Sequence, residues 1–235
     1  MKTVVVLPTY NERENISELI KKILSHSVDI LVVDDNSPDG TWKIVEDISK
    51  KDSRVKLLKR IAERGRGTAG VAGFRKALEL GYDIIIEMDA DFSHNPDDIP
   101  KLLSAIKEGD VVLGSRLIKE GKQLGRSKYR KLLTSFANFY IRTTLGMKIR
   151  DCNSGYRCFK RKVLDAINLD TITAKGPDIV QEILYKAFLK KFKIIEIPIV
   201  FAERKKGSSK LGLKHLFWGY TKVLKLKWQH LTGKI

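Results

Sequence analysis

The chain has 235 residues and a net charge of +17, with 43% hydrophobic and 31% charged residues, a composition that excludes an intrinsically disordered protein. Its two cysteines exclude a disulfide scaffold, and its four scattered histidines form no zinc-binding pattern. No apolar run approaches the roughly 18 residues of a membrane-spanning helix, and the apolar N-terminal run is too short for a signal peptide, so we expect a reduced, cytosol-facing chain that does not cross a bilayer.

The first half of the sequence alternates continuous apolar runs with segments of helical spacing. Strands are expected at Thr3–Leu7, Asp29–Val33, Val55–Leu58, Ile84–Met88 and Asp110–Leu113. Helices are expected near Ile16–Leu24, Thr41–Lys50, Gly70–Leu80 and Ile99–Lys107. Because the strands alternate with helices and carry few polar residues, the pattern predicts a parallel sheet that is covered on both faces.

The second half departs from this alternation. After a basic loop, the expected elements are a helix at Tyr129–Leu145, a strand at Tyr156–Phe159, a helix near Ile179–Lys190 and a strand at Lys193–Val200. We predict one α/β domain over residues 1–212, with a mostly parallel central sheet flanked by helices, and a basic amphipathic helix in residues 213–235.

Polar residues follow four of the predicted strands at the point where each strand ends. The four segments are Pro8 to Glu12, Asp34 to Ser37, Asp89 to Asp91, and Gly114 to Arg116. Ligands of open α/β sheets bind outside the carboxyl ends of the strands. We therefore expect these four segments to line one binding site.

Asp89 and Asp91 directly follow the buried run Ile84–Met88. Carboxylates two residues apart on an extended segment point the same way, and such hard oxygen ligands suit Mg²⁺ or Mn²⁺ bound together with substrate phosphates. The same residues also suit a turn in which Asp91 or Ser93 caps a helix. Asp34 at a second strand end favours a nucleotide site, because an acidic residue there can bind ribose or a base.

The segment Gly65 to Gly70 matches the dinucleotide-binding pattern G-x-G-x-x-G. That pattern lies in the turn directly after a strand, whereas residues 59–64 separate this segment from the preceding predicted strand. We therefore favour a mobile loop with close helix packing at these glycines over a dinucleotide site.

Six segments of the chain read, in order, LPTYNERENI, VVDDNSPDGTW, MDADFSHNPDDIP, GSR, SGYR and FAERKKGSSKLG. In their order and spacing they resemble those of the dolichyl-phosphate mannose synthases, the polyprenyl-phosphate branch of the family-2 glycosyltransferases. From Val4 to about Leu213 the chain resembles this family. The resemblance implies a Rossmann-like glycosyltransferase-A fold, and an enzyme that moves mannose from GDP-mannose to dolichyl or another polyprenyl phosphate.

The resemblance also implies the roles of individual residues. The residues implied to bind the guanosine are Pro8, Tyr10, Glu12, Val32 and Asp34. Those implied to bind the diphosphate and its Mg²⁺ or Mn²⁺ are Asp89, Ala90 and Asp91. Cationic positions around the phosphates are Arg116, Arg204 and Lys210, and the acceptor phosphate is expected at Arg116, Arg130 and Thr134. The expected metal ligands are Asp89 and Asp91, and the expected catalytic residues are Asp91 and Arg116. Glu182 matches an acidic residue near the sugar, although on a helix it could equally face solvent.

The chemistry of such a transfer is consistent with these residue types. A divalent cation and cationic side chains help a nucleoside diphosphate to leave by neutralising its developing charge. A phosphate monoester, whose second pKa is about 6, can attack near neutral pH without a strong general base. We find no histidine suited to that role, since His94 has no evident partner. We predict an in-line displacement that inverts an α-linked donor to a β-linked product, without a covalent enzyme intermediate.

The positive charge is concentrated in two blocks, residues 116–131 and 202–235, which together hold +14. Such blocks indicate anionic partners or, alternatively, a solvated lysine-rich surface. In residues 213–231, leucines and aromatic residues at helical spacing predict a helix in the membrane interface or one that packs on the core. With a polyprenyl acceptor, we expect a peripheral protein at the cytoplasmic face of a membrane, and a separate anchoring subunit is compatible with this.

Four alternatives stay open on the sequence. Another nucleotide sugar, such as UDP-glucose, could serve as donor to the same lipid class. A nucleic-acid-binding module would use the positive charge but leaves Asp89 and Asp91 unexplained, so we expect no nucleic acid partner. Arg116 could instead be a surface residue paired with an acid, and Asp151 and Arg157 could form a structural ion pair.

Overall fold

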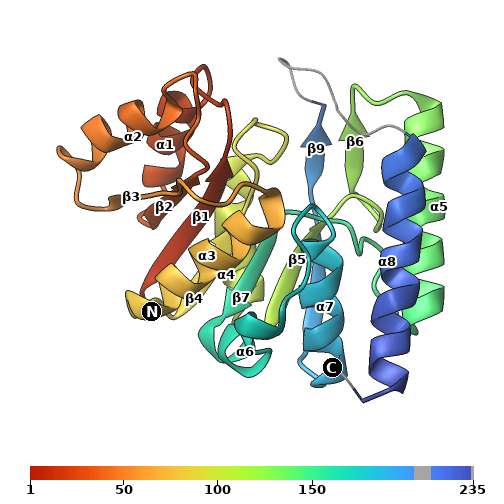
Figure 1. Cartoon of the computed structure of the whole chain (residues 1–235). Coiled ribbons are helices and arrows are strands. Elements are labelled where there is room, and N and C mark those ends of the chain that lie inside the picture. Colours follow the sequence, from red (N-terminus) through yellow and green to blue (C-terminus); the bar gives the residue numbers. More distant parts are fainter. Residues whose placement is uncertain (204–212, 234–235) are drawn as a thin grey trace.

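The computed structural model describes residues 1–203 and 213–233, with the side chains of residues 213–218 left out. The described residues form a central sheet with helices on both faces (Figure 1). The strands are β1 (Thr3–Thr9), β2 (Asp29–Asp34), β3 (Val55–Lys59), β4 (Ile84–Glu87), β5 (Val111–Ser115), β6 (Lys122–Leu124), β7 (Arg157–Lys160), β8 (Ile194–Pro198) and β9 (Val200–Ala202). The α-helices are α1 (Ile16–Leu24), α2 (Thr41–Ser49), α3 (Arg66–Glu79), α4 (Ile99–Ala105), α5 (Lys128–Leu145), α6 (Arg161–Ala166), α7 (Ile179–Leu189) and α8 (Leu213–Leu231), and 3₁₀ turns lie at Pro96–Asp98 and Leu169–Thr171.

The main sheet has the strand order β3-β2-β1-β4-β7-β5-β8. Neighbouring strands are parallel except for β7, which runs antiparallel to both β4 and β5. The carboxyl ends of β1, β2, β4 and β5 therefore meet at one edge, which confirms the predicted convergence of the four polar segments. The register of β7 places Arg157 opposite Glu87, at the same end of β4.

Alternation along the strands explains the two halves of the core. Val4 and Val6 of β1 face the side covered by α3, α6 and α7, and α5 and α8 complete that side. Val5 and Leu7 face the side covered by α1, α2 and α4. Burial on both faces is why these strands read as continuous apolar runs.

Each predicted strand and helix has a counterpart, although the strand predicted at Lys193–Val200 is divided between β8 and β9, and β6, α6 and the two 3₁₀ turns were not predicted. Strands β6 and β9 have three residues each and pair in parallel as a separate small sheet, and helix α6 has six residues. Segments this short contain too little periodicity to be recognised in a sequence. Helix α3 also begins at Arg66, four residues before the predicted start, so most of the glycine-rich segment is helical and not a loop.

Gly67 explains why the helix tolerates that composition. A Cβ at this position would lie 2.7 Å from the backbone carbon of Lys175, so the helix start fits against the 174–176 segment only with glycine there. The predicted close packing is thus confirmed, and tertiary contact outweighs the low helix propensity of glycine.

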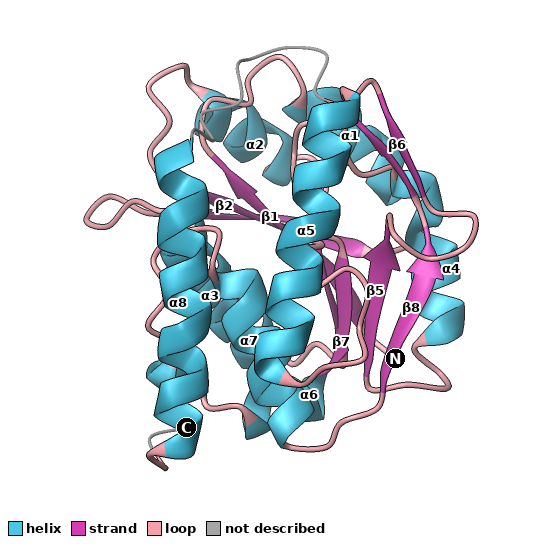
Figure 2. Cartoon of the chain, turned by 90° about the vertical axis from the view of Figure 1, so that its right-hand side faces the viewer, coloured by secondary structure: helices cyan, strands magenta, loops and turns pink. Residues whose placement is uncertain are grey.

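The C-terminal helix α8 lies against α5 (Figure 2), where Tyr140 and Tyr220 meet edge to face with their ring centroids 4.8 Å apart. Val223 and Leu226 are buried in the core, whereas Trp228 is 55% exposed. The helix therefore packs on the core as the second interpretation proposed, and also carries exposed apolar residues. No helix in the described ranges is both long and apolar enough to span a bilayer.

Candidate active site

Asp34 organises the loop that follows β2. Its carboxylate is fully buried and accepts hydrogen bonds from the Thr9 hydroxyl (2.8 Å) and from the backbone N–H and hydroxyl of Ser37 (2.8 and 2.7 Å). Three short bonds hold the ends of β1 and β2 in one geometry. The structure therefore places Asp34 at the expected edge, with its carboxylate bonded to protein groups.

The predicted guanosine residues divide into two groups. Pro8, Tyr10 and Glu12 lie together at the end of β1, where Tyr10 is 42% exposed and lies beneath the guanidinium of Arg64 at 5.6 Å. The backbone N–H of Glu12 donates to the Thr41 hydroxyl at 3.0 Å, which ties this segment to the start of α2. Val32 lies inside β2 with its side chain in the core, so its side chain is not brought to the site.

An open cavity of about 480 Å³ adjoins this segment. It is lined by residues 36–40 after β2, by the start of α2 with Trp42, and by Arg13 and Arg64. The size lies within the range of small-molecule sites. Residues 36–42 belong to the segment VVDDNSPDGTW, but sequence reasoning did not find this cavity, because its other walls, Arg13 and Arg64, are brought to it by the fold.

A buried network of charges connects β4 to the acidic motif. Glu87 is fully buried and accepts hydrogen bonds from Arg157 of β7 and, at 2.6 Å, from Arg66 of α3. A second nitrogen of Arg66 lies 3.3 Å from Asp89. Burial alone would raise the pKa of Glu87, but the charges of Arg157 and Arg66 outweigh it and hold the pKa below its ordinary value. Arg157 therefore forms its ion pair with Glu87 and not with Asp151.

His94 fixes the backbone of the acidic motif. The N–H of Asp89 donates to Nδ1 of His94 at 3.1 Å, so that nitrogen carries no proton and the proton is on Nε2. The imidazole is buried and stacks on Tyr156 with centroids 5.0 Å apart, and this burial lowers its pKa. His94 thus does have a partner, contrary to the expectation from sequence.

The acidic motif is not a helix cap. The Asp91 carboxylate accepts from the Ser93 N–H at 3.0 Å within its own turn, and the following 3₁₀ turn is capped by Asn95, whose side chain accepts from the N–H of Asp97. Gly155 lies against this turn, since a Cβ there would be 3.4 Å from Asp89 Oδ2. The capping interpretation of Asp91 or Ser93 is therefore wrong.

The carboxylates at the end of β4 fit a divalent cation that receives its remaining ligands from a substrate. Within the described ranges, no group of three or more His, Cys, Asp or Glu side chains could enclose a metal ion. Asp89, whose side chain is 32% exposed, and Asp91 provide carboxylate oxygens at the end of β4. Mg²⁺ and Mn²⁺ accept such a set when substrate phosphates and water supply the other ligands.

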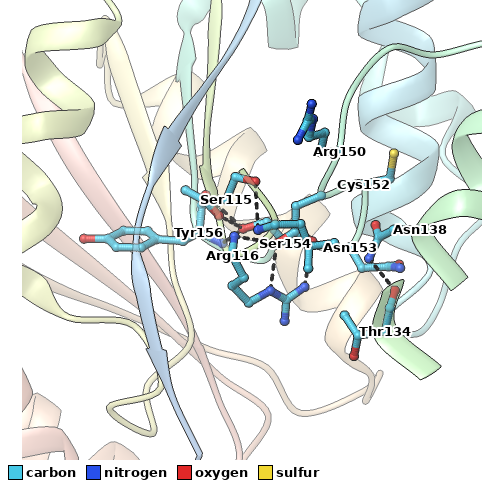
Figure 3. Close-up of polar contacts among 12 residues, drawn as sticks. Ser115, Arg116, Thr134, Asn138, Arg150, Cys152, Asn153, Ser154 and Tyr156 are labelled. Carbon is cyan, nitrogen blue, oxygen red and sulfur yellow. Dashed lines mark hydrogen bonds and ion pairs between the residues drawn. The ribbon is translucent and has the colours of Figure 1, made fainter. Parts of the chain in front are cut away.

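Arg116 is held rigidly at the end of β5 (Figure 3). Its Nε and Nη2 each donate to the fully buried Asp151 at 2.7 Å, and its backbone N–H donates to the same carboxylate at 2.9 Å. Burial would lower the pKa of Arg116, but the bonds to Asp151 raise it above its ordinary value, so the residue stays charged. Arg116 pairs with an acid as the alternative proposed, but its side chain is only 10% exposed.

A second group of cationic residues surrounds the start of α5. Arg130 forms an ion pair with Glu203, and Thr134 accepts a hydrogen bond from Arg126 at 2.9 Å. The ring of Phe201 on β9 lies 5.1 Å from the guanidinium of Arg116 and 5.8 Å from that of Arg126. Arg126 and Phe201 were missed by sequence reasoning, although Arg126 lies within the first basic block. Arg204 and Lys210 lie outside the described residues.

Glu182 does not face solvent. Its carboxylate is buried and accepts hydrogen bonds from the N–H groups of Thr173 (3.0 Å) and Ala174 (2.9 Å). The adjacent carbonyl of Lys175 accepts from the N–H of Gly67 at 3.0 Å. Glu182 therefore holds residues 173–175 in place. The start of α3, which includes Arg66, packs against these residues.

Comparison with known proteins agrees with this geometry. Residues 4–167 match the model of glycosyl transferase family 2. The chain belongs to this family. This family-2 glycosyltransferase is 38% identical to a protein of Micrococcus luteus named undecaprenyl-phosphate mannosyltransferase, with 90% of this chain and 88% of the relative covered. It is 39% identical to the polyprenol monophosphomannose synthase of Mycolicibacterium smegmatis, with 90% and 81% covered. A dolichol-phosphate mannosyltransferase of Pyrococcus furiosus is 40% identical, with 100% of this chain and 66% of the relative covered.

Solved structures support the same fold for this family-2 glycosyltransferase. Glucosyl-3-phosphoglycerate synthase of Mycobacterium tuberculosis, in complex with Mn²⁺ and UDP, superimposes with a TM-score of 0.65 at 19% identity, covering 96% of this chain and 78% of the other. A mannosyltransferase of Pyrobaculum calidifontis, in complex with GDP-Man and Mn²⁺, gives 0.63 at 18% identity, covering 95% and 64%. At these identities the likeness shows the fold alone, which confirms the glycosyltransferase-A prediction.

Proposed function

We propose that this family-2 glycosyltransferase transfers mannose from GDP-mannose to dolichyl or another polyprenyl phosphate, with inversion to the β-linked product. The observation that carries the proposal is the meeting of Asp89, Asp91 and Arg116 at one edge of the sheet. The polyprenyl-phosphate mannosyltransferases that are 38–40% identical over at least 90% of this chain support the choice of sugar and lipid.

The proposed roles follow from the positions of the side chains. Asp89 and Asp91 would hold Mg²⁺ or Mn²⁺, which when bound neutralises charge on the leaving diphosphate. Arg116, held by Asp151 and adjacent to Asp89, adds a fixed positive charge that needs no reorganisation during the reaction. Tyr10 and Glu12 at the end of β1 would contact the nucleoside.

The residues near the transfer site favour a direct displacement. His94 is buried, bonded to the Asp89 backbone and held neutral, so it is not placed as a general base for the acceptor. The acceptor phosphate supplies its own anionic nucleophile near neutral pH. A single in-line attack at the anomeric carbon inverts its configuration, and the GDP leaves from the opposite face.

Transfer of labelled mannose to solvent-extractable lipid tests the proposal. With GDP-mannose, dolichyl phosphate and Mn²⁺, we expect labelled lipid, and we expect removal of the metal by chelation to abolish it, with recovery when Mn²⁺ is restored. UDP-glucose offered to the same lipid is the competing donor. Faster transfer from UDP-glucose, or transfer that is unaffected by chelation, would contradict the proposal.

The exposed face of α5 supports a membrane surface as partner. Tyr129, Leu132, Phe136 and Phe139 recur at helical spacing and are each 55–68% exposed. The adjacent helix α8 adds Leu224, Trp228 and Leu231. Lysines and arginines on both helices would attract anionic lipids, and apolar residues would enter the interface. We propose that this surface holds the protein peripherally on the cytoplasmic leaflet, where the acceptor lipid is embedded.

Vesicle binding tests the membrane surface directly. Replacing Phe136 and Phe139 together by serine removes two exposed apolar side chains, and we expect binding to vesicles with one-third phosphatidylglycerol to fall about tenfold or more. Replacing Ile61, which is 77% exposed on a different surface, by serine is the matched control. Equal vesicle binding by all three proteins in a sedimentation assay would contradict the proposal.

A further inference from the structure

Arg126 is a cationic side chain whose direct hydrogen-bond partners among the described residues are neutral, although the carboxylates of Glu203 and Asp151 lie near enough to act on it. Its Nη1 donates to the side-chain oxygens of Gln123 (2.8 Å) and Thr134 (2.9 Å), both of which are neutral. Among the described residues it forms no ion pair, whereas its neighbours Arg116 and Arg130 are paired with Asp151 and Glu203. The residues outside the described part include no aspartate or glutamate, so no acidic side chain there can pair with it.

The position of Arg126 is as informative as its charge. It is half-buried just before the start of α5, next to β6. Its guanidinium and that of Arg116 both lie near the ring of Phe201. Burial and the charges of Arg116 and Arg130 lower the pKa of Arg126, and this outweighs the opposite effect of Glu203 and Asp151. Among the described residues, the guanidiniums of these three arginines are thus matched by only two carboxylates, and a bound anion would compensate the remaining charge.

Phe201 relates this position to the acidic motif. Its ring contacts His94 edge to face at 5.8 Å, and the N–H of the next residue, Ala202, donates to the carbonyl of Ser93 at 3.2 Å. Arg116 therefore lies between two sides of one site. On one side are Asp89 and Asp91, and on the other is Arg126. An anion at Arg126 would therefore lie on the side of Arg116 away from a diphosphate held at Asp89 and Asp91.

We propose that Arg126 binds the phosphate monoester of the lipid acceptor, an inference that rests on the proposed function. Thr134 positions Arg126 in this arrangement, because its hydroxyl donates to the carbonyl of Arg130 and accepts from Arg126. The exposed apolar face of α5, which includes Leu132 and Phe136, begins beside this site, where the lipid chain would leave it.

Steady-state kinetics of Arg126→Gln test the assignment. With a detergent-solubilised polyprenyl phosphate as acceptor, we expect its KM to rise about 10- to 100-fold, the effect of losing a charge-assisted hydrogen bond, while the KM for GDP-mannose stays within twofold. Arg126→Lys keeps the charge without the planar guanidinium and is expected to give an intermediate KM. Arg75→Gln removes the same charge from a 48% exposed side chain on α3 and is the matched control, with unchanged kinetics expected. An unchanged acceptor KM, or an equal rise of the donor KM, would overturn the assignment.

A binding measurement separates this inference from the proposed function. Calorimetry with a short-chain prenyl phosphate and, separately, with inorganic phosphate needs no mannosyl transfer. If the wild type binds the prenyl phosphate and Arg126→Gln binds it at least tenfold more weakly, the inference holds even where transfer from GDP-mannose fails. If both proteins bind it equally, or only inorganic phosphate binding depends on Arg126, the residue does not recognise the lipid acceptor.

Discussion

Replacing Asp91 by asparagine is expected to lower kcat for mannosyl transfer about a thousandfold, the magnitude that follows when a charged group that stabilises a leaving group is lost. The substitution is nearly isosteric. The asparagine oxygen can still accept the hydrogen bond that Ser93 donates to Asp91 at 3.0 Å, so the turn after β4 is expected to persist. What is lost is one negative charge of the pair that would hold the cation.

The measurement combines initial rates with Mn²⁺ titration. The signal of free Mn²⁺ in electron paramagnetic resonance reports binding directly, and we expect Asp91→Asn to bind Mn²⁺ in the presence of GDP at least tenfold more weakly than the wild type. Asp97→Asn removes the same charge six residues further along, at a side chain that is 76% exposed, and should leave both quantities unchanged. If Asp91→Asn keeps its rate within tenfold, Asp91 is not a ligand of a required cation.

Replacing Arg157 by methionine is expected to reduce the free energy of unfolding by about 3–5 kcal/mol, the cost of leaving a buried charge without its partner. Arg157 is 1% exposed, pairs with the fully buried Glu87 and donates a further hydrogen bond to the carbonyl of Val180 at 3.0 Å. Among the described residues, Arg66 would then be the one cationic side chain bonded to Glu87, and its guanidinium also contacts Asp89.

Urea denaturation measures this effect against an exposed pair of the same kind. Arg75 and Asp170 lie 2.5 Å apart with side chains that are 48% and 80% exposed, and Arg75→Met is expected to cost about 0–1 kcal/mol. Adding Glu87→Gln to Arg157→Met should recover part of the loss, because the uncompensated charge is then removed. Equal losses for the buried and the exposed arginine would show that Glu87 and Arg157 are not coupled.

The same pair gives the protein a dependence on acid. The folded-state pKa of Glu87 lies below its ordinary value of 4.5, so its charged form contributes stability that is fully present above pH 4.5. That contribution is lost as the pH falls through the folded-state pKa. The difference in stability between the wild type and Arg157→Met is therefore expected to shrink on acidification, which urea denaturation at several pH values would detect.

The sequence predicted the sheet and its polar edge well, for physical reasons that particular elements make clear. Strands such as Ile84–Glu87 are buried on both faces and read as unbroken apolar runs, and the residue types after them are unusual for buried turns. The convergence of Asp89 and Arg116 followed from the rule that carboxyl ends of parallel strands meet at one edge. Both inferences use only local sequence.

Contacts between distant segments were beyond such reasoning. Arg66 reaches Asp89 because α3 begins earlier than its glycines suggest, and the partner of Arg157 depends on the register of β7 against β4. Arg126 was indistinguishable from the other cations of its block, because what sets it apart is the pairing of its neighbours with Asp151 and Glu203. Pairings of this kind are set by the assembled tertiary structure.

The antiparallel strand β7 has a consequence for the order in which the chain folds. Within the described part of the chain, strands β1 to β4 pair only with one another and with β7. The half of the sheet that ends in Asp89 and Asp91 can therefore assemble while the rest of the chain is still being synthesised. Strand β5 pairs with β7 and β8, both of which follow it in the chain. The strand that carries Arg116 to the site therefore has no neighbour until later residues are made, and we expect the ends of β1, β2 and β4 to assemble before Arg116 joins them.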